Sequence, residues 1–163
     1  MRITVVGSGG WGTALALVLE ENGHDVTLWS HRPEKAEELK RTRENPMLKG
    51  VRLPESLHLT ADLNAAGESD VVVMVTPSYA VRETAAKLRG IVKPGTVIVS
   101  ASKGIERGSS LRLSQVIDQE LGGSCPVVVL SGPSHAEEVG RHIPTGVVAA
   151  AERLEHAELV QDL

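Results

Sequence analysis

Short apolar runs alternate with longer amphipathic segments along this 163-residue chain. The runs are rich in Val, Ile and Leu, which is typical of strands buried on both faces of a parallel sheet. We predict strands at Arg2–Val6, Asp25–Trp29, Leu57–Thr60, Val71–Val75, Val97–Ser100, Val127–Leu130 and Gly146–Ala150. We predict helices at Trp11–Glu21, Pro33–Arg43, Leu63–Ala66, Tyr79–Leu88, Ser110–Leu121, Ser134–Val139 and Arg153–Leu163. This alternation favours an α/β fold, a doubly wound and mostly parallel sheet with helices on both faces.

Local signals mark several of the element boundaries. Asp62 and Ser78 are predicted to cap the helices that follow them. The stretch Glu44–Ser56 contains two prolines and a glycine and is predicted to be a loop. The last helix has an apolar stripe and no stop signal. Either this helix is the natural last element, or residues 1–163 are one domain of a longer protein. We favour the second alternative, with this stripe exposed to join a second domain. The stripe consists of Leu154, Leu159, Val160 and Leu163.

Composition and charge exclude several classes of function. The formal net charge is −4 and no basic run is present, so a nucleic-acid partner is not expected. No stretch reaches the roughly 18 apolar residues that a membrane span needs. Cys125 is the only cysteine, which excludes a disulfide within the chain and suits a reducing cytoplasm. We predict no metal site.

A glycine-rich turn directly after the first predicted strand is the strongest functional signal. Its spacing is G-x-G-x-x-G, and it lies between a strand and a helix as in the dinucleotide-binding turn of a Rossmann-like fold. The first glycine would permit a tight turn, the second close approach of a pyrophosphate, and the third helix packing. The helix N-terminus would offer free N–H groups to the phosphates. The segment consists of Gly7, Ser8, Gly9, Gly10, Trp11 and Gly12.

The end of the second predicted strand bears on the choice of cofactor. An NAD site usually has Asp or Glu here for the adenosine ribose 2′-hydroxyl. This chain has His31 and Arg32 instead. An arginine fork matches the oxygens of a 2′-phosphate, so the cofactor is predicted to be NADP or NAD, with NADPH favoured. The alternative is that both residues are merely solvated.

Three more segments follow predicted strands and should therefore share the edge where open α/β sheets bind ligands. Pro77 would stiffen a turn beneath the cofactor, or would belong to an ordinary strand-to-helix turn. Lys103 could reach a phosphate or a carbonyl as a point charge, or could be an ordinary surface lysine. Gly132 permits close backbone approach, and Ser134 could cap the next helix. His135 is as compatible with packing as with catalysis, and no role is assigned to it.

Together these segments resemble a known family. Gly-Ser-Gly-Gly-Trp-Gly, Trp-Ser-His-Arg, Val-Thr-Pro-Ser, Ser-Lys-Gly-Ile-Glu and Ser-Gly-Pro-Ser-His-Ala occur in this order. The chain is similar to the N-terminal domain of bacterial-type NAD(P)-dependent sn-glycerol-3-phosphate dehydrogenase. The resemblance implies an oxidoreductase that reduces dihydroxyacetone phosphate to sn-glycerol 3-phosphate for phospholipid synthesis. It leaves open whether the full-length enzyme is a homodimer.

The resemblance also implies roles for individual residues. Substrate contacts fall on Lys103, Gly132 and Ser134, and Lys103 would polarise the substrate carbonyl. In the family, the principal catalytic lysine and the phosphate-gripping residues belong to a helical C-terminal domain. That domain is absent from these 163 residues, so we expect them to bind cofactor without turnover. Met47-Leu48-Lys49-Gly50 departs from the family pattern and puts a loop contact to the cofactor in doubt. The implied cofactor contacts are Gly10, Trp11, His31, Arg32, Lys103 and Ala136.

Two other functions remain open from the residues. One is the N-terminal domain of a 6-phosphogluconate or 3-hydroxyacid-type dehydrogenase, whose substrate loop is usually a Gly-rich Ser-x-Gly stretch. The other is a non-enzymatic nucleotide-sensing Rossmann module of the kind found in ion-channel regulators. Such a module would normally carry the ribose-binding carboxylate and would have no need of Lys103.

Overall fold

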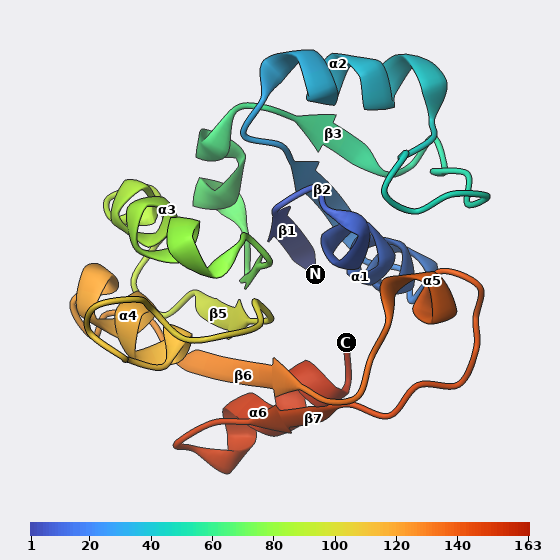
Figure 1. Ribbon diagram of the computed structural model, residues 1–163. Helices are drawn as coiled ribbons and strands as arrows, with labels where there is room; N and C mark the ends of the chain where they lie inside the picture. The colour runs from blue at the N-terminus through green and yellow to red at the C-terminus, as the bar shows by residue number, and fades with distance from the viewer.

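One seven-stranded sheet runs through the molecule (Figure 1). The computed structural model describes every residue from Met1 to Leu163. The strand order is β3-β2-β1-β4-β5-β6-β7, and all pairs are parallel except β6 with β7. The predicted doubly wound, mostly parallel sheet is therefore confirmed. The strands are β1 (Arg2–Val6), β2 (Asp25–Trp29), β3 (His58–Thr60), β4 (Val71–Met74), β5 (Val97–Ser100), β6 (Val127–Ser131) and β7 (Val148–Ala150).

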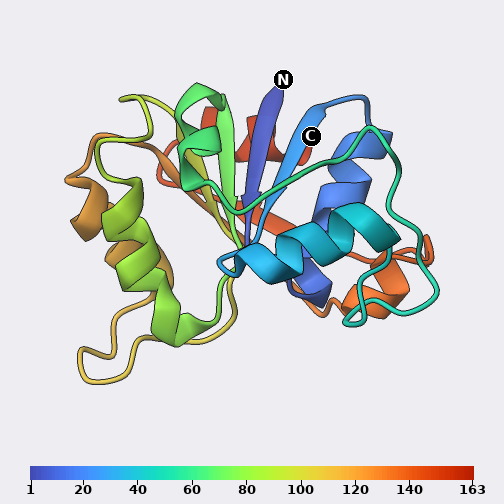
Figure 2. The ribbon, with the colours of Figure 1, turned by 90° about the horizontal axis from the view of Figure 1, so that it is seen from above.

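Helices cover both faces of this sheet (Figure 2). One layer contains α3 and α4, and α1 and α2 lie on the opposite side. No helix is long and apolar enough to span a bilayer. The helices are α1 (Gly10–Glu21), α2 (Pro33–Thr42), α3 (Val81–Leu88), α4 (Leu113–Leu121), α5 (Ala136–Val139) and α6 (Leu154–Gln161), with 3-10 turns η1 (Leu63–Glu68) and η2 (Ser78–Ala80).

The alternation of side chains along each strand divides the core into two layers. In β5, Val97 and Val99 join the cluster beneath α1, whereas Ile98 joins the cluster beneath α3 and α4. In β4 all four residues are buried, as strands covered on both faces require. The sheet is therefore buried on both faces. Because its strands β1 to β6 are parallel, their carboxyl ends share one edge.

Two boundary predictions were wrong in detail, and a third was confirmed. The fourth long helix begins at Leu113, because Ser110 adopts a left-handed conformation (φ 58°) and Ile105 pairs with Arg112 in an isolated antiparallel bridge. Ser78 is the first residue of η2 and does not cap α3. The Asp62 cap is confirmed, since its carboxylate accepts from the Asn64 N–H at 3.0 Å.

The expected exposure of the final apolar stripe was also wrong. Leu159, Val160 and Leu163 are half-buried and pack against the core cluster on the α1 side of the sheet. Helix α6 folds back onto β6 and β7, which gives the stripe its partner within this chain. Only Leu154 remains largely exposed, at 71%.

Candidate functional site

The glycine turn after β1 is shaped by backbone contacts that exclude side chains at two positions. Gly7 has φ 131°, and a Cβ there would lie 2.6 Å from the Val75 carbonyl oxygen. A Cβ at Gly12 would overlap the carbonyl oxygen of Gly7. Both residues are glycine for reasons internal to the fold, namely a tight turn and close packing of α1.

Gly9 differs from these two positions. Its backbone is extended (φ −72°, ψ 179°), and no atom lies within 4 Å of the place where a Cβ would be. The N–H groups of Gly9, Gly10 and Trp11 donate no hydrogen bond within the chain, and no side chain caps α1. The turn therefore offers free donors and the positive end of a helix beside open space, which suits a phosphate group.

Two buried hydroxyls without a partner flank the same turn. Ser30 follows β2 and Thr76 lies just beyond β4, on the two neighbours of β1. Neither Ser30 Oγ nor Thr76 Oγ1 has a hydrogen-bond partner. Buried polar atoms are usually satisfied, and exceptions concentrate at functional sites. These hydroxyls, the free N–H groups and the space at Gly9 fit a bound dinucleotide.

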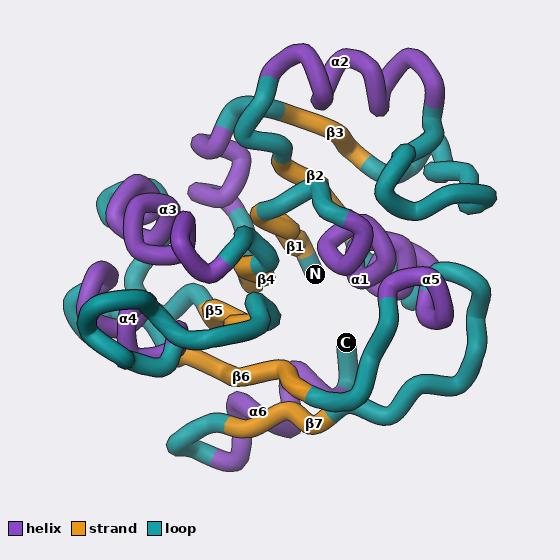
Figure 3. Tube along the Cα trace, in the orientation of Figure 1, coloured by secondary structure: helices purple, strands orange, loops and turns teal.

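Two residues that the sequence analysis did not identify donate hydrogen bonds to the backbone of the turn. Lys35 Nζ on α2 donates to the Ser8 carbonyl oxygen at 2.5 Å. Asn45 Nδ2 donates to the same oxygen at 3.1 Å and to Thr13 Oγ1 at 2.7 Å. Asn45 belongs to the segment between α2 and β3. Figure 3 shows this loop in teal. Partial burial and the nearby Arg32 guanidinium lower the pKa of Lys35, and Glu38 opposes this shift.

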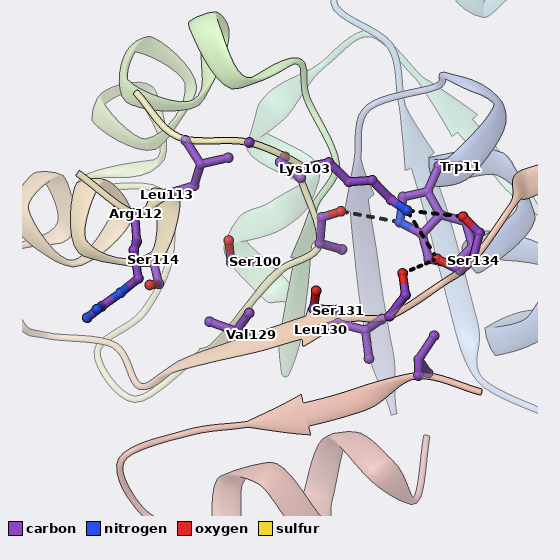
Figure 4. A pocket seen from close by; sticks show the side chains of 15 residues that line it. Trp11, Ser100, Lys103, Arg112, Leu113, Ser114, Val129, Leu130, Ser131 and Ser134 are labelled. Atoms are coloured by element: carbon purple, nitrogen blue, oxygen red, sulfur yellow. Dashed lines mark hydrogen bonds between the residues drawn. The ribbon is translucent and has the colours of Figure 1, made fainter. Parts of the chain in front are cut away.

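A cavity of about 350 Å³ lies beside the turn and brings together four of the predicted site residues, Trp11, Lys103, Gly132 and Ser134 (Figure 4). Trp11 Nε1 donates to the Ala101 carbonyl oxygen at 3.2 Å. Lys103 Nζ donates to the Ser134 carbonyl oxygen at 3.0 Å and lies 6.0 Å from the centre of the Trp11 ring. The ammonium of Lys103 therefore lies on the cavity wall, held by a carbonyl and by the aromatic face.

Gly132 and Ser134 also line this cavity, but each is fixed by the chain itself. A Cβ at Gly132 would lie 2.8 Å from the Gly146 carbonyl oxygen, so glycine is needed for packing against the segment before β7. The predicted cap by Ser134 was wrong, because His135 occupies the N-cap position of α5. The buried Ser134 instead faces Lys103, with its Oγ 3.4 Å from Nζ.

The other predicted residues lie around the same edge. The Ala136 Cβ is 3.5 Å from where a Gly10 Cβ would be, so Ala136 lies against the glycine turn. His31 and Arg32 follow β2 and are exposed, and Arg32 is the N-cap residue of α2. Pro77, beyond β4, is exposed and precedes η2. His135 is also exposed.

An ion-pair network supports the loop that carries Lys103. Arg82 on α3 donates to the Glu106 carboxylate from Nε and from Nη2, both at 2.7 Å. It also donates to Glu120 on α4 at 2.6 Å. Hydrogen bonds from Arg82 and from Ser109 lower the pKa of Glu106 to about 2. A bidentate arginine holds its partner in a defined orientation, so this network ties the loop to both helices.

Fold and site together define a class. A parallel sheet of order 3-2-1-4-5-6, a glycine turn after its first strand and free N–H groups at the following helix make a Rossmann-type dinucleotide-binding domain. The residues after β1, β5 and β6 meet at one edge, as predicted for Gly9, Lys103 and Gly132.

Comparison with known proteins identifies the family. A family model described as NAD-dependent glycerol-3-phosphate dehydrogenase N-terminus matches residues 2–157, and the chain belongs to this family. It is 52% identical over 167 residues to the NAD(P)+ glycerol-3-phosphate dehydrogenase of Prosthecochloris aestuarii, covering 100% of this chain and 50% of that protein. The corresponding protein of Moorella thermoacetica is 52% identical over 163 residues, with 99% and 48% covered.

Solved structures agree with this assignment. Glycerol-3-phosphate dehydrogenase from Coxiella burnetii matches with a TM-score of 0.91 and 35% identity, over 99% of this chain and 50% of that one. A 3-hydroxyisobutyrate dehydrogenase from Salmonella typhimurium, at 18% identity and a TM-score of 0.67, shares the fold alone. The predicted family is confirmed over both alternatives. The chain spans about half the length of the curated relatives it matches.

Proposed function

We propose that residues 1–163 bind NADPH or NADH at the glycine turn and form one wall of the site where dihydroxyacetone phosphate and sn-glycerol 3-phosphate interconvert. The relatives are named for this dehydrogenase activity. The supporting observation is the group of free N–H donors at Gly9, Gly10 and Trp11, next to the unfilled space at Gly9. A reducing cytoplasm suits the single buried, free Cys125.

Different residues along the edge of the sheet would bind the cofactor and the substrate. The bound nicotinamide would supply the hydride. The N–H groups of the turn would hold the pyrophosphate, and Ala136 would lie against it. Lys103 would orient the substrate carbonyl and stabilise developing negative charge on its oxygen, aided by Gly132 and Ser134. Transfer needs donor and carbonyl held in near-attack geometry, and this cavity supplies one wall of such a pocket.

We propose in addition that Arg32 gives a preference for the 2′-phosphate of NADPH. Arg32 is exposed at the end of β2 and forms no side-chain hydrogen bond or ion pair in the chain, so its guanidinium is free. The neighbouring Ser30 and His31 bring no negative charge to this position. A guanidinium–phosphate contact there would stabilise NADPH and leave NADH unaffected.

Calorimetric titration tests this preference. R32A should weaken NADPH binding by about 1–3 kcal/mol, the typical contribution of a charged hydrogen bond, and leave NADH binding unchanged. R41A removes another exposed arginine, near the far end of α2, and serves as the matched control. Equal losses for NADH and NADPH in R32A would reject the 2′-phosphate role.

An activity assay tests the proposed division of the substrate site. Residues 1–163 should oxidise NADPH in the presence of dihydroxyacetone phosphate at no more than the background rate. A protein of the relatives' full length, carrying the same N-terminal residues, is the comparison. Turnover by residues 1–163 near that protein's rate would show that the catalytic groups already lie within them.

A further inference from the structure

The carbonyl oxygen of Ser8 is the most heavily engaged acceptor in the glycine turn. It receives Lys35 Nζ at 2.5 Å and Asn45 Nδ2 at 3.1 Å, from two segments far away in the sequence. Ser8 is only 6% exposed and Asn45 only 2%, so the Asn45 contact is shielded from water, and the Lys35 contact is partly buried. Bonds from charged and buried donors are stronger than exposed neutral ones.

Asn45 is itself held rigidly. Its Nδ2 also donates to Thr13 Oγ1 at 2.7 Å, in the first turns of α1, and its Oδ1 accepts from the Met47 N–H at 3.0 Å. The Met47 carbonyl oxygen in turn lies 2.6 Å from where a Gly10 Cβ would be. The loop after α2 therefore packs directly on the turn at Gly10, and glycine there lets the loop approach.

Fixing the Ser8 carbonyl also fixes the next N–H group. All peptide bonds in the chain are trans, and in a planar trans peptide the C=O of one residue points opposite to the N–H of the next. Drawing the Ser8 oxygen toward Lys35 and Asn45 therefore aims the Gly9 N–H in the opposite direction. Polarisation of the carbonyl by an ammonium group also strengthens that N–H as a donor.

We propose that Lys35, with Asn45, is a positioning residue for the cofactor's pyrophosphate. It acts through Ser8 by setting the orientation of the Gly9 N–H. This inference rests on the proposed dinucleotide site and adds to it a residue outside the glycine motif. Because the pyrophosphate is common to both cofactors, loss of Lys35 should weaken the binding of NADH and of NADPH equally. Arg32, by contrast, should act on NADPH alone.

Three probes separate the two roles in calorimetric titrations: NADH, NADPH and adenosine 2′-phosphate, which has no pyrophosphate. K35M keeps most of the side-chain volume and removes the charge. It should lower the affinity for NADH and for NADPH by the same factor, about tenfold, which corresponds to about 1.4 kcal/mol. The affinity for adenosine 2′-phosphate should not change. K35R should restore most of the affinity. K40M removes an exposed lysine on the same helix whose only partner is Glu37, and it should change nothing.

Several results would overturn the inference. NADH affinity that is unchanged in K35M would do so, as would a loss of adenosine 2′-phosphate binding, which would place Lys35 on the 2′-phosphate. The NMR resonance of the Gly9 amide tests the geometry without ligand. It should shift in K35M and not in K40M, and an unshifted resonance overturns the inference. Failure of the unaltered chain to bind NADH would instead refute the proposed function, and the Gly9 resonance would still decide the role of Lys35.

Discussion

The glycines of the turn should respond oppositely to the same substitution. Gly7→Ala and Gly9→Ala each add one methyl group, two residues apart. At Gly7 the methyl would meet the Val75 carbonyl oxygen at 2.6 Å and its carbon at 2.8 Å, in a backbone conformation with φ 131°. At Gly9 it would meet nothing within 4 Å, in an extended conformation that alanine adopts freely.

The magnitudes follow from these contacts. A non-glycine residue at such a positive φ costs about 1–3 kcal/mol. Overpacking against backbone adds about 1–3 kcal/mol. Gly7→Ala should therefore lower the free energy of unfolding by about 2–6 kcal/mol. At about 2–4 °C per kcal/mol for a chain of this size, its Tm should fall by roughly 4–24 °C. Gly9→Ala should instead stabilise by about 0.4–1 kcal/mol, because alanine restricts the unfolded chain.

Thermal unfolding and NADH titration of both variants test this reasoning. Gly9→Ala should keep or raise the Tm and yet lose at least about tenfold in NADH affinity, because its methyl group occupies the space proposed for the pyrophosphate. Gly23→Ala, also without a neighbour within 4 Å but at φ 84°, separates backbone strain from steric overlap. A Gly9→Ala variant that unfolds as early as Gly7→Ala, or that binds NADH normally, would refute the assignment.

Two further predictions concern stability. The carboxylate of Glu106 has its pKa lowered to about 2 by Arg82, so the stability it contributes is complete above about pH 4.5 and is lost as pH falls toward 2. The Tm of the unaltered chain should fall more steeply than that of E106Q across this range, and parallel curves would contradict the ion pair. Ile98→Ala should cost about 2–5 kcal/mol in denaturant unfolding, because Ile98 is fully buried beneath α3 and α4. Ile105→Ala, at 59% exposure, should stay within about 0.5 kcal/mol, and equal losses would contradict the core assignment.

The sheet was predictable because its strands are unambiguous in the sequence. Val71–Met74 is entirely apolar and short, a pattern that few elements other than a doubly covered strand produce. The start of α4 was not predictable from the same information. It depends on a left-handed Ser110 and on the bridge between Ile105 and Arg112, and that bridge exists only once the loop has closed.

The site was predictable only where the strand ends define it. Lys103 follows β5 and Gly132 follows β6, so the parallel topology alone places them on one edge. Lys35 and Asn45 escaped prediction because their partner Ser8 lies 27 and 37 residues away. The pattern of α2 marks Lys35 as one polar residue among many. Its contact depends on how the helix lies over the turn, and no local spacing encodes that.

The final helix shows that prediction from sequence has the same limit for apolar surfaces. The apolar period of Leu159, Val160 and Leu163 indicates that one face of α6 needs a partner, because exposing apolar side chains to water is unfavourable. Periodicity does not say what covers that face. The covering surface is the core of this domain, which α6 reaches by following the antiparallel β7 back along β6. A periodic pattern thus determines that a surface is buried, and the chain's topology determines against which partner.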